Sequence, residues 1–349
     1  MAEPAPDERR RQVLVAVVRE HIDTAEPVGS RSVAKHSDLG LSPATIRNTM
    51  ADLEEMGYLT QPHTSAGRVP TDKAYRFYVD TFSEQRGYSE PLPTRPLTHS
   101  TRSQTVVEQM MEQASLDLSS SSRMTALLLA PPLKQARLGR LELTALPRDH
   151  ALAVVVTEQG WVTTRTLTLD QRVTPEELRE VGRQLTRRFQ GKTFQEIVDE
   201  VAAPPDPLDP LHARTGSLVQ QVFSLLRDRT LYIGGAINIL EHPEFWPLST
   251  MRVIFRTFEE KGRLVDLLSE LANETGIQVM IGRENPFEEM QECSLVTSTY
   301  TYDDQVMGIL GVVGPKRMQY GRLIPLVAET ANYVSQSLTR YRQLLYIPS

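Results

Sequence analysis

Residues 41–70, LSPATIRNTMADLEEMGYLTQPHTSAGRVP, constrain the fold more than any other segment. Ser42 followed by Pro43 predicts a helix start, because serine caps free backbone N–H groups and proline at the first helical position loses no hydrogen bond. Gly57 predicts the end of that helix, near Met56. Two short runs, YLTQ and RVPT, then surround a small polar tip. The segment therefore predicts a helix followed by a hairpin.

Helical patterns flank this segment on both sides. Residues 8–22 carry Val13, Val17 and Val18 on one side, Ser30 is expected to cap the short helix RSVAKHS, and Thr71 is expected to cap DKAYRFYVDTF. The order helix, short helix, turn, helix, two strands is the plan of a winged helix-turn-helix. We predict this fold for residues 1–86.

The helix 42–56 has two distinct sides when its residues are placed about 100° apart. Its apolar side, expected to face the core, consists of Ile46, Met50, Leu53 and Met56. Ala44 and Asn48 fall opposite, with Thr45 and Arg47 at the flanks. Arginine pairs with guanine, asparagine with adenine, and threonine reaches a base or a phosphate. We therefore expect Thr45, Arg47 and Asn48 to contact base edges.

Charge is also divided along this helix. Arg47 lies in the first half, whereas Asp52, Glu54 and Glu55 lie in the second. A helix that enters the major groove by its N-terminal end needs this arrangement, because its positive dipole end meets the phosphates and its carboxylates stay away from them. The alternative is an ordinary surface helix whose acids happen to lie at one end.

The hairpin tip 62–68, PHTSAGR, suits contact with phosphate or the minor groove, because small residues let backbone N–H groups approach DNA and an arginine can enter the groove. A solvated loop is the alternative. Further candidates for phosphate contacts are Arg31 and Lys35 before this segment and Lys73 and Arg76 after it, with a plain surface charge as the alternative for each. Besides Lys35, the expected DNA contacts are Ser30, Arg31, Ser42, Ala44, Thr45, Arg47, Asn48, His63, Thr64, Ser65, Gly67, Arg68, Lys73 and Arg76.

The overall charge does not announce a nucleic-acid partner. The net charge is −6, and residues 1–86 hold eleven Lys/Arg against thirteen Asp/Glu, a net of −2. DNA binding must therefore rest on local charge placement. The same charge keeps open a different class of function, in which the N-terminal region binds another protein.

Signals for catalysis, cofactors and membranes are weak. The seven histidines have no metal-ligand spacing, the glycines match no phosphate-binding pattern, and Cys293 in a β-like run is expected to be a buried small hydrophobe. We expect no enzyme activity, no cofactor and no metal. The sequence has no apolar run of membrane length and no apolar signal core, so a cytoplasmic protein is expected.

The remainder predicts an α+β multidomain chain. Residues 87–103 contain three prolines and are expected to form a linker. Strand-like and helical runs at 104–172 and 250–349 predict a body, and a more helical block at 173–249 predicts an insertion. The last helix, 321–346, is expected to pack within its own domain, with pairing between subunits as the alternative.

The run SPATIRNTMADLEEMGYLTQPHTSAGRVPTDKAYRFYVD resembles the HrcA heat-inducible transcription repressors. EPVGSR at 26–31, IGRENP at 281–286 and GILGVVGPKRMQYGRLIPLV at 308–327 are also similar to the family. The resemblance implies a winged-helix domain, a GAF-like domain, and a dimerisation domain inserted in it.

The resemblance further implies a homodimer on double-stranded DNA, at an inverted-repeat operator upstream of chaperonin and class I chaperone operons. It implies that chaperonin keeps the repressor active until heat diverts it to unfolded proteins. It implies no ligand for the GAF-like domain. A repressor that senses a small molecule through that domain stays open as an alternative.

Overall fold

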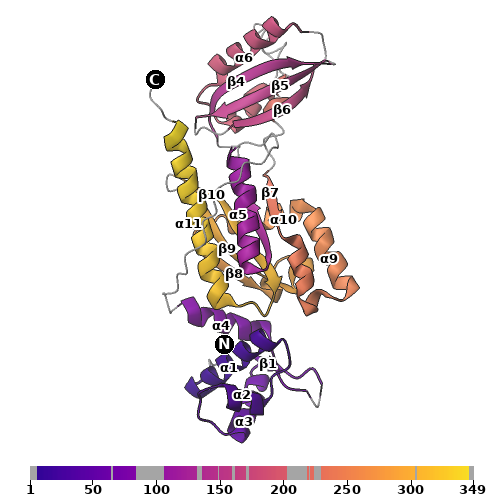
Figure 1. Cartoon of the computed structure of the whole chain (residues 1–349), viewed down its shortest axis with the longest axis vertical. Helices are drawn as coiled ribbons and strands as arrows, with labels where there is room; N and C mark the ends of the chain where they lie inside the picture. Colours follow the sequence, from indigo (N-terminus) through magenta and orange to yellow (C-terminus); the bar gives the residue numbers. More distant parts are fainter. Residues whose placement is uncertain are drawn as a thin grey trace.

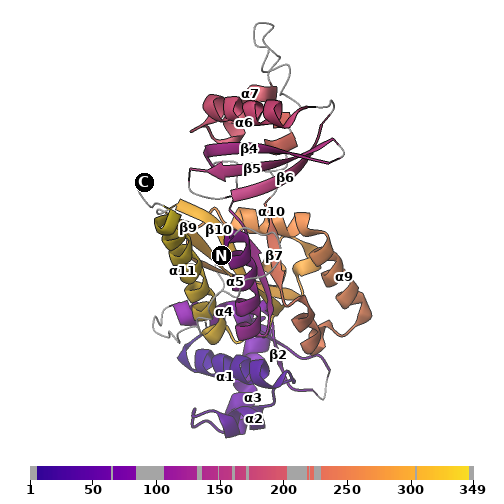
Figure 2. The same ribbon diagram turned by 45° about the horizontal axis from the view of Figure 1, so that its top comes forward.

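Three groups of elements follow one another along the long axis of the computed structural model (Figure 1). We call them the head (residues 6–83), the body (106–131 and 229–345) and the insert (136–223). The head and the insert lie at opposite ends of the body (Figures 1 and 2). The structure describes residues 6–63, 66–83, 106–131, 136–147, 149–158, 162–169, 173–202, 218–219, 221–223, 229–302 and 305–345.

The head contains four helices and a small hairpin. In chain order they are α1 (Glu8–Thr24), α2 (Ser30–His36), α3 (Pro43–Glu55), β1 (Leu59–Thr60), β2 (Val69–Pro70) and α4 (Asp72–Ser83). The strands pair in antiparallel register, and Arg68 continues the pairing through a bridge to Val28. This order of elements is the one that the sequence predicts.

One helix start in the head differs from the prediction. Ser30 is the first residue of α2, and Gly29 occupies the cap position without a side-chain hydrogen bond. The Thr71 hydroxyl donates to the carbonyl oxygens of Gly57 and Tyr58, at 2.8 and 3.0 Å, so it ties α4 to the end of α3.

The body is built on a five-stranded antiparallel sheet in the order β7-β3-β10-β9-β8. Its strands are β3 (Thr125–Leu129), β7 (Leu231–Gly234), β8 (Ile277–Ile281), β9 (Cys293–Tyr302) and β10 (Gln305–Pro315). Its helices are α5 (Val106–Ser122), α9 (Leu248–Glu259), α10 (Lys261–Leu271) and α11 (Tyr320–Leu345). Short 3-10 helices are η3 (Ala236–Glu241), η4 (Pro243–Phe245), η5 (Gly282–Glu284) and η6 (Glu288–Met290).

Helices cover both faces of the body sheet. In β3, Ala126 and Leu128 belong to the core shared with α5 and α11, whereas Leu127 and Leu129 belong to the core shared with α9 and α10. A strand covered on both faces is buried at every position, which explains why TALLL lacks the apolar–polar alternation of a strand with one exposed face. Helix α11 packs on β9 and β10 of its own sheet, as the sequence predicts.

The insert has a sheet of its own. Strands β4 (Leu138–Leu146), β5 (His150–Thr157) and β6 (Val162–Thr168) pair in the order β4-β5-β6. Helices α6 (Pro175–Phe189) and α7 (Phe194–Ala202) share a separate apolar core with this sheet.

These sheets correct the predicted domain limits. The expected division gave 104–172 to the body and 173–249 to the insertion, but β4, β5 and β6 pair only with one another among the described residues. Strand β7 and the elements up to α9 belong to the body instead. Burial alternates along β4 and β5, as in a sheet with one covered face, whereas β3 is buried at every position. The predicted domain limits did not take this difference into account. The expected linker, 87–103, lies outside the described residues.

The head and the body are joined through α4, which lies between the rest of the head and the body in both views (Figures 1 and 2). Buried residues of α1, α3 and α4 form one continuous apolar cluster with those of α5 and α11. None of the described helices is long and apolar enough to cross a membrane.

Candidate nucleic-acid interface

The first turn of α3 is fixed by its cap. The Ser42 hydroxyl accepts a hydrogen bond from the Thr45 backbone N–H at 3.1 Å, and Pro43 occupies the first helical position, as predicted. The Ser42 and Thr45 hydroxyls lie 2.9 Å apart. Because the cap and the proline hold the first turn, the side chains of this end of the helix start from a defined backbone.

One side of α3 is buried and sets the rotation of the helix. Ile46, Met50 and Leu53 are at most 3% exposed, and the Thr49 hydroxyl donates to the Thr45 carbonyl oxygen at 3.0 Å. Met56 is partly buried at the edge of the same core. The predicted apolar side is confirmed.

The opposite side of α3 points outward. Ala44, Arg47 and Asn48 are exposed, and Thr45 is half-buried. The structure therefore presents the residues predicted to meet base edges together, on the first two turns of one helix. Arg31 on α2 is also exposed, and Ser30 is half-buried.

Two of the three acids in the second half of α3 are paired. Asp52 lies 2.9 Å from the Arg10 guanidinium of α1, and Glu54 lies 2.8 Å from Nε of Arg68. Sequence reasoning missed Arg10, because its partner is 42 positions away and nothing local announces the contact.

The exposed cations of this face are not neutralised by acids within the described part of the protein. Among the described residues, Arg31, Lys35 and Arg47 take part in no ion pair of 4.0 Å or less. The net charge of residues 1–86, −2, therefore conceals a local excess of positive charge at α2 and the first half of α3. Lys35, expected from the sequence as a phosphate contact, belongs with this set.

The hairpin is only partly as predicted. His63 at its tip is exposed, and the Gln61 side-chain amide donates to the Ala66 carbonyl oxygen at 3.0 Å. Gly67 packs so closely on Val28 that an added Cβ would lie 2.5 Å from that residue's carbonyl oxygen. Gly67 thus permits strand pairing at the base of the hairpin. Thr64 and Ser65 lie outside the described residues.

Three expected phosphate contacts have partners within the protein. Arg68 pairs with Glu54, and Lys73 donates to the Met56 carbonyl oxygen at 3.0 Å while its ammonium lies 4.6 Å from the centre of the Tyr58 ring. Arg76 donates to the Val279 carbonyl oxygen at 2.6 Å and pairs with Glu284, both in the body. The structure therefore does not bring Lys73 and Arg76 to the exposed side of α3.

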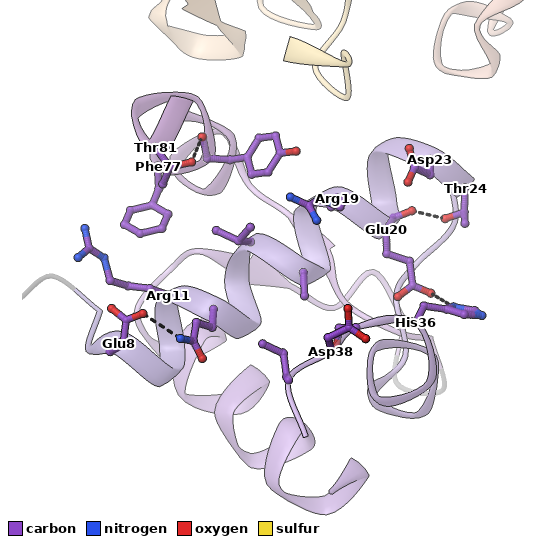
Figure 3. Close-up of a pocket in the computed structure, with 16 residues that line it drawn as sticks. Glu8, Arg11, Arg19, Glu20, Asp23, Thr24, His36, Asp38, Phe77 and Thr81 are labelled. Atoms are coloured by element: carbon purple, nitrogen blue, oxygen red, sulfur yellow. Dashed lines mark hydrogen bonds and ion pairs between the residues drawn. The ribbon is translucent and has the colours of Figure 1, made fainter. Parts of the chain in front are cut away.

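Negative charge gathers in a different part of the head. An open groove of about 840 Å³ runs between α1, α4 and the chain after α2 (Figure 3). Its charged lining comprises Glu8, Arg11, Arg19, Glu20, Asp23 and Asp38. None of the expected DNA contacts lines it. This groove accounts for much of the acidity that argued against DNA in the sequence.

Cys293 is buried, as predicted. Burial raises the pKa of its thiol to about 12, so the thiolate that a nucleophile or metal ligand requires is disfavoured. Among the described residues, no group of three or more His, Cys, Asp or Glu side chains could hold a metal ion.

Comparison with known proteins gives the family. The family model described as "HrcA protein C terminal domain" matches residues 108–324. The Heat-inducible transcription repressor HrcA of Geobacter sulfurreducens is 40% identical over 336 residues, which cover 95% of this chain and 98% of that one. The protein of the same name from Moorella thermoacetica is 38% identical over 339 residues and covers 95% and 98%.

A solved structure supports the fold. A crystal structure described as a hypothetical protein at 2.2 Å resolution superposes with a TM-score of 0.67 at 24% identity, over 96% of this chain and 99% of that one. The relatives match both the head and the body over nearly their whole length. On these grounds, the chain belongs to the HrcA family of heat-inducible transcription repressors.

Proposed function

We propose that this protein is a negative regulator of heat-shock operons that binds double-stranded DNA through its head, which we interpret as a winged helix-turn-helix. The observation that carries the proposal is the first half of α3, where Arg47 and Asn48 are exposed on a capped helix whose later acids Asp52 and Glu54 are paired. Family membership gives the direction of regulation, since the relatives are named heat-inducible repressors.

In the proposed complex, α3 enters the major groove by its N-terminal end. Thr45, Arg47 and Asn48 reach base edges. Ser42 and Arg31 contact the DNA backbone, and His63 contacts the adjacent groove. The free N–H groups and the dipole at the start of α3 favour nearby phosphate. This pose brings Arg31, Lys35 and Arg47 toward the DNA and leaves the acidic groove elsewhere.

We further propose that the protein acts as a homodimer on an inverted repeat. One head makes few phosphate contacts, so a second head on a two-fold axis is needed for tight binding. The insert is our candidate for the dimer interface. In β5, Leu152, Val154 and Val156 are half-buried on the sheet face opposite α6, and none of them belongs to the core that α6 shares with this sheet.

The proposal extends to regulation and place of action. We interpret the body as a GAF-like domain without a ligand, and the protein as cytoplasmic and non-enzymatic. Chaperonin would maintain the active dimer, and heat would release operator DNA by diverting chaperonin to unfolded proteins. Family membership supports this part of the proposal.

The test is made in cells that lack the gene for this protein. We expect chaperonin transcripts to rise at normal temperature and to fall again when the wild-type gene is restored. Restoring Arg47→Ala should leave the transcripts high, whereas Arg9→Ala should repress normally, because Arg9 is an exposed arginine on α1 outside the proposed interface. Unchanged chaperonin transcripts in the deletion strain would contradict the proposal.

A further inference from the structure

The N-terminal turn of α4 is bound to two separate segments of the body. One carboxylate oxygen of Asp72 accepts a hydrogen bond from the Arg283 backbone N–H at 3.0 Å, and the other lies 3.2 Å from Nζ of Lys316. Asp72 is also in the first turn of its helix, where a carboxylate is favoured by the helix dipole. One half-buried side chain thus ties the head to both η5 and the end of β10.

One turn further along α4, Arg76 makes a second attachment. Its guanidinium donates to the Val279 carbonyl oxygen at 2.6 Å and pairs with Glu284. Glu284 is itself positioned by the body, because its carboxylate accepts the Ile281 backbone N–H at 2.8 Å. Arg76 therefore contacts acceptor groups whose geometry is set by β8 and η5.

The backbone of the body is shaped for this contact. Gly282 has a φ of 52°, in the left-handed region, and a Cβ placed on it would lie 2.2 Å from the Asp72 carboxylate. Only a glycine lets the η5 backbone approach α4 this closely.

Apolar packing completes the joint. The Tyr75 and Tyr320 rings lie 6.4 Å apart, and both side chains are buried. The Tyr320 hydroxyl is held within the body, because it donates to the Lys316 carbonyl oxygen at 2.7 Å and lies 3.0 Å from the Ser294 hydroxyl. A shared core, two ion-paired side chains and a close backbone approach make a rigid joint, unlike the polar and mobile interfaces common between domains.

We propose that Asp72 and Arg76 are positioning residues, which fix the direction of the head on the body so that the dimer accepts only one spacing between operator half-sites. The inference rests on the proposed dimeric DNA binding. Each added base pair moves a half-site by about 3.4 Å and turns it by about 35° around the helix axis. Two heads held rigidly cannot follow that rotation, whereas heads on a loose joint can.

The inference also gives a role to the C-terminal segments that carry the family resemblance. Arg283 and Glu284 lie in IGRENP at 281–286, and Lys316 and Tyr320 lie in GILGVVGPKRMQYGRLIPLV at 308–327. In this structure both segments contact α4. They form the surface of the body that contacts the DNA-binding head.

The experiment uses the full chain and a series of inverted repeats whose half-site spacing is lengthened or shortened by one to five base pairs, together with a single half-site. For the wild type we expect the Kd to rise by at least about 30-fold away from the best spacing, because the avidity of the second head is lost. In Asp72→Ala and Arg76→Gln, the Kd at other spacings should exceed the Kd at the best spacing by less than about 5-fold. The difference should shrink because binding at the best spacing becomes weaker. The Kd for the single half-site should stay unchanged.

Arg263→Gln is the matched control, because it removes an arginine that pairs with Glu289 on the body surface away from α4. It should keep the wild-type spacing profile. If Asp72→Ala does not fold, Lys316→Gln loosens the same contact from the body side. A full wild-type spacing profile in folded joint variants would overturn the inference, whereas a wild type that does not prefer the inverted repeat to a half-site would contradict the proposed function itself.

Discussion

Glu54 and Arg68 form a 2.8 Å ion pair that joins the second half of α3 to the base of the hairpin. The contact changes the interpretation of both residues. The acid that would repel phosphate is neutralised, and the arginine expected to enter a groove is engaged. The head uses this pair to hold the hairpin against α3.

Arg68→Ala should therefore leave the salt dependence of operator binding nearly unchanged. The measurement is the slope of log K against log salt concentration, whose magnitude falls by about 0.9 for each phosphate that the protein no longer neutralises. Arg31→Ala is the comparison and should show that smaller slope, because Arg31 is exposed without an ion pair among the described residues. If the slope falls equally in both variants, Arg68 leaves Glu54 when DNA binds and the prediction from the sequence is right.

Gly67→Ala should open the base of the hairpin. The new Cβ would lie 2.5 Å from the Val28 carbonyl oxygen, so the backbone must separate at a cost of about 1–3 kcal/mol. Val28 and Arg68 exchange two hydrogen bonds of 2.8 Å, and hydrogen exchange at their amides measures the opening.

The control for this prediction is Gly29→Ala, on the other side of Val28. A Cβ there meets nothing within 4 Å, so protection of the Val28 and Arg68 amides should change by less than about 1 kcal/mol. Equal protection in the two variants would show that the bridge does not depend on Gly67.

Acidification should weaken the head. Burial lowers the pKa of His21 below its ordinary value of 6.5, and the nearby Arg317 cation lowers this pKa further. The hydrogen bond to the Glu26 carbonyl oxygen opposes them and raises the pKa, but the net shift is downward. Between the two pKa values, His21 binds a proton in the unfolded chain but not in the folded one. The contribution of neutral His21 to stability is therefore fully present above pH 6.5 and is lost as the pH falls toward the folded pKa.

The measurement is the free energy of unfolding of the head between pH 7 and pH 5, by hydrogen exchange. One proton contributes at most about 1.4 kcal/mol per pH unit, and His21→Asn should remove its share of that slope. A variant whose stability depends on pH as steeply as the wild type would show that His21 does not carry the effect.

Val154→Arg should separate the proposed dimer. The side chain is half-buried at the middle of the β5 row on the face opposite α6, and a charge there would be buried without a partner on association. Light scattering should report the monomer mass, and the affinity for an inverted repeat should fall about 100-fold while that for a half-site is kept. Gln190→Arg adds the same charge at the exposed end of α6 and should stay dimeric; a dimer in both variants would move the interface away from this face.

Local patterns in the sequence predicted what local interactions decide. Ser42 and Pro43 fix the start of α3 from within the segment, and the wheel placed Ile46, Met50 and Leu53 in the core correctly. The same patterns gave most strands of the body, and they gave α11 its packing on its own sheet.

Partners distant in the chain could not be predicted in this way. Arg76 looked like any surface cation after a hairpin, because its partners Val279 and Glu284 are more than 200 residues away. Strands β3 and β4 look alike as strands, yet they belong to different sheets, and only the alternation of burial along β4 separates them. Strand choice depends on tertiary packing, which strand propensity does not contain.

In the proposed complex, the first two turns of α3 read each half of an inverted repeat. A footprint titration of the full chain on the chaperonin promoter, at one fixed salt concentration, measures this reading. We expect protection of both half-sites, at least about 10³-fold tighter than binding to random DNA. Arg47→Ala should weaken the specific protection by about 1–3 kcal/mol, and Arg9→Ala should not. A wild-type protein that protects no inverted repeat, or binds it no tighter than random DNA, would contradict the proposed function.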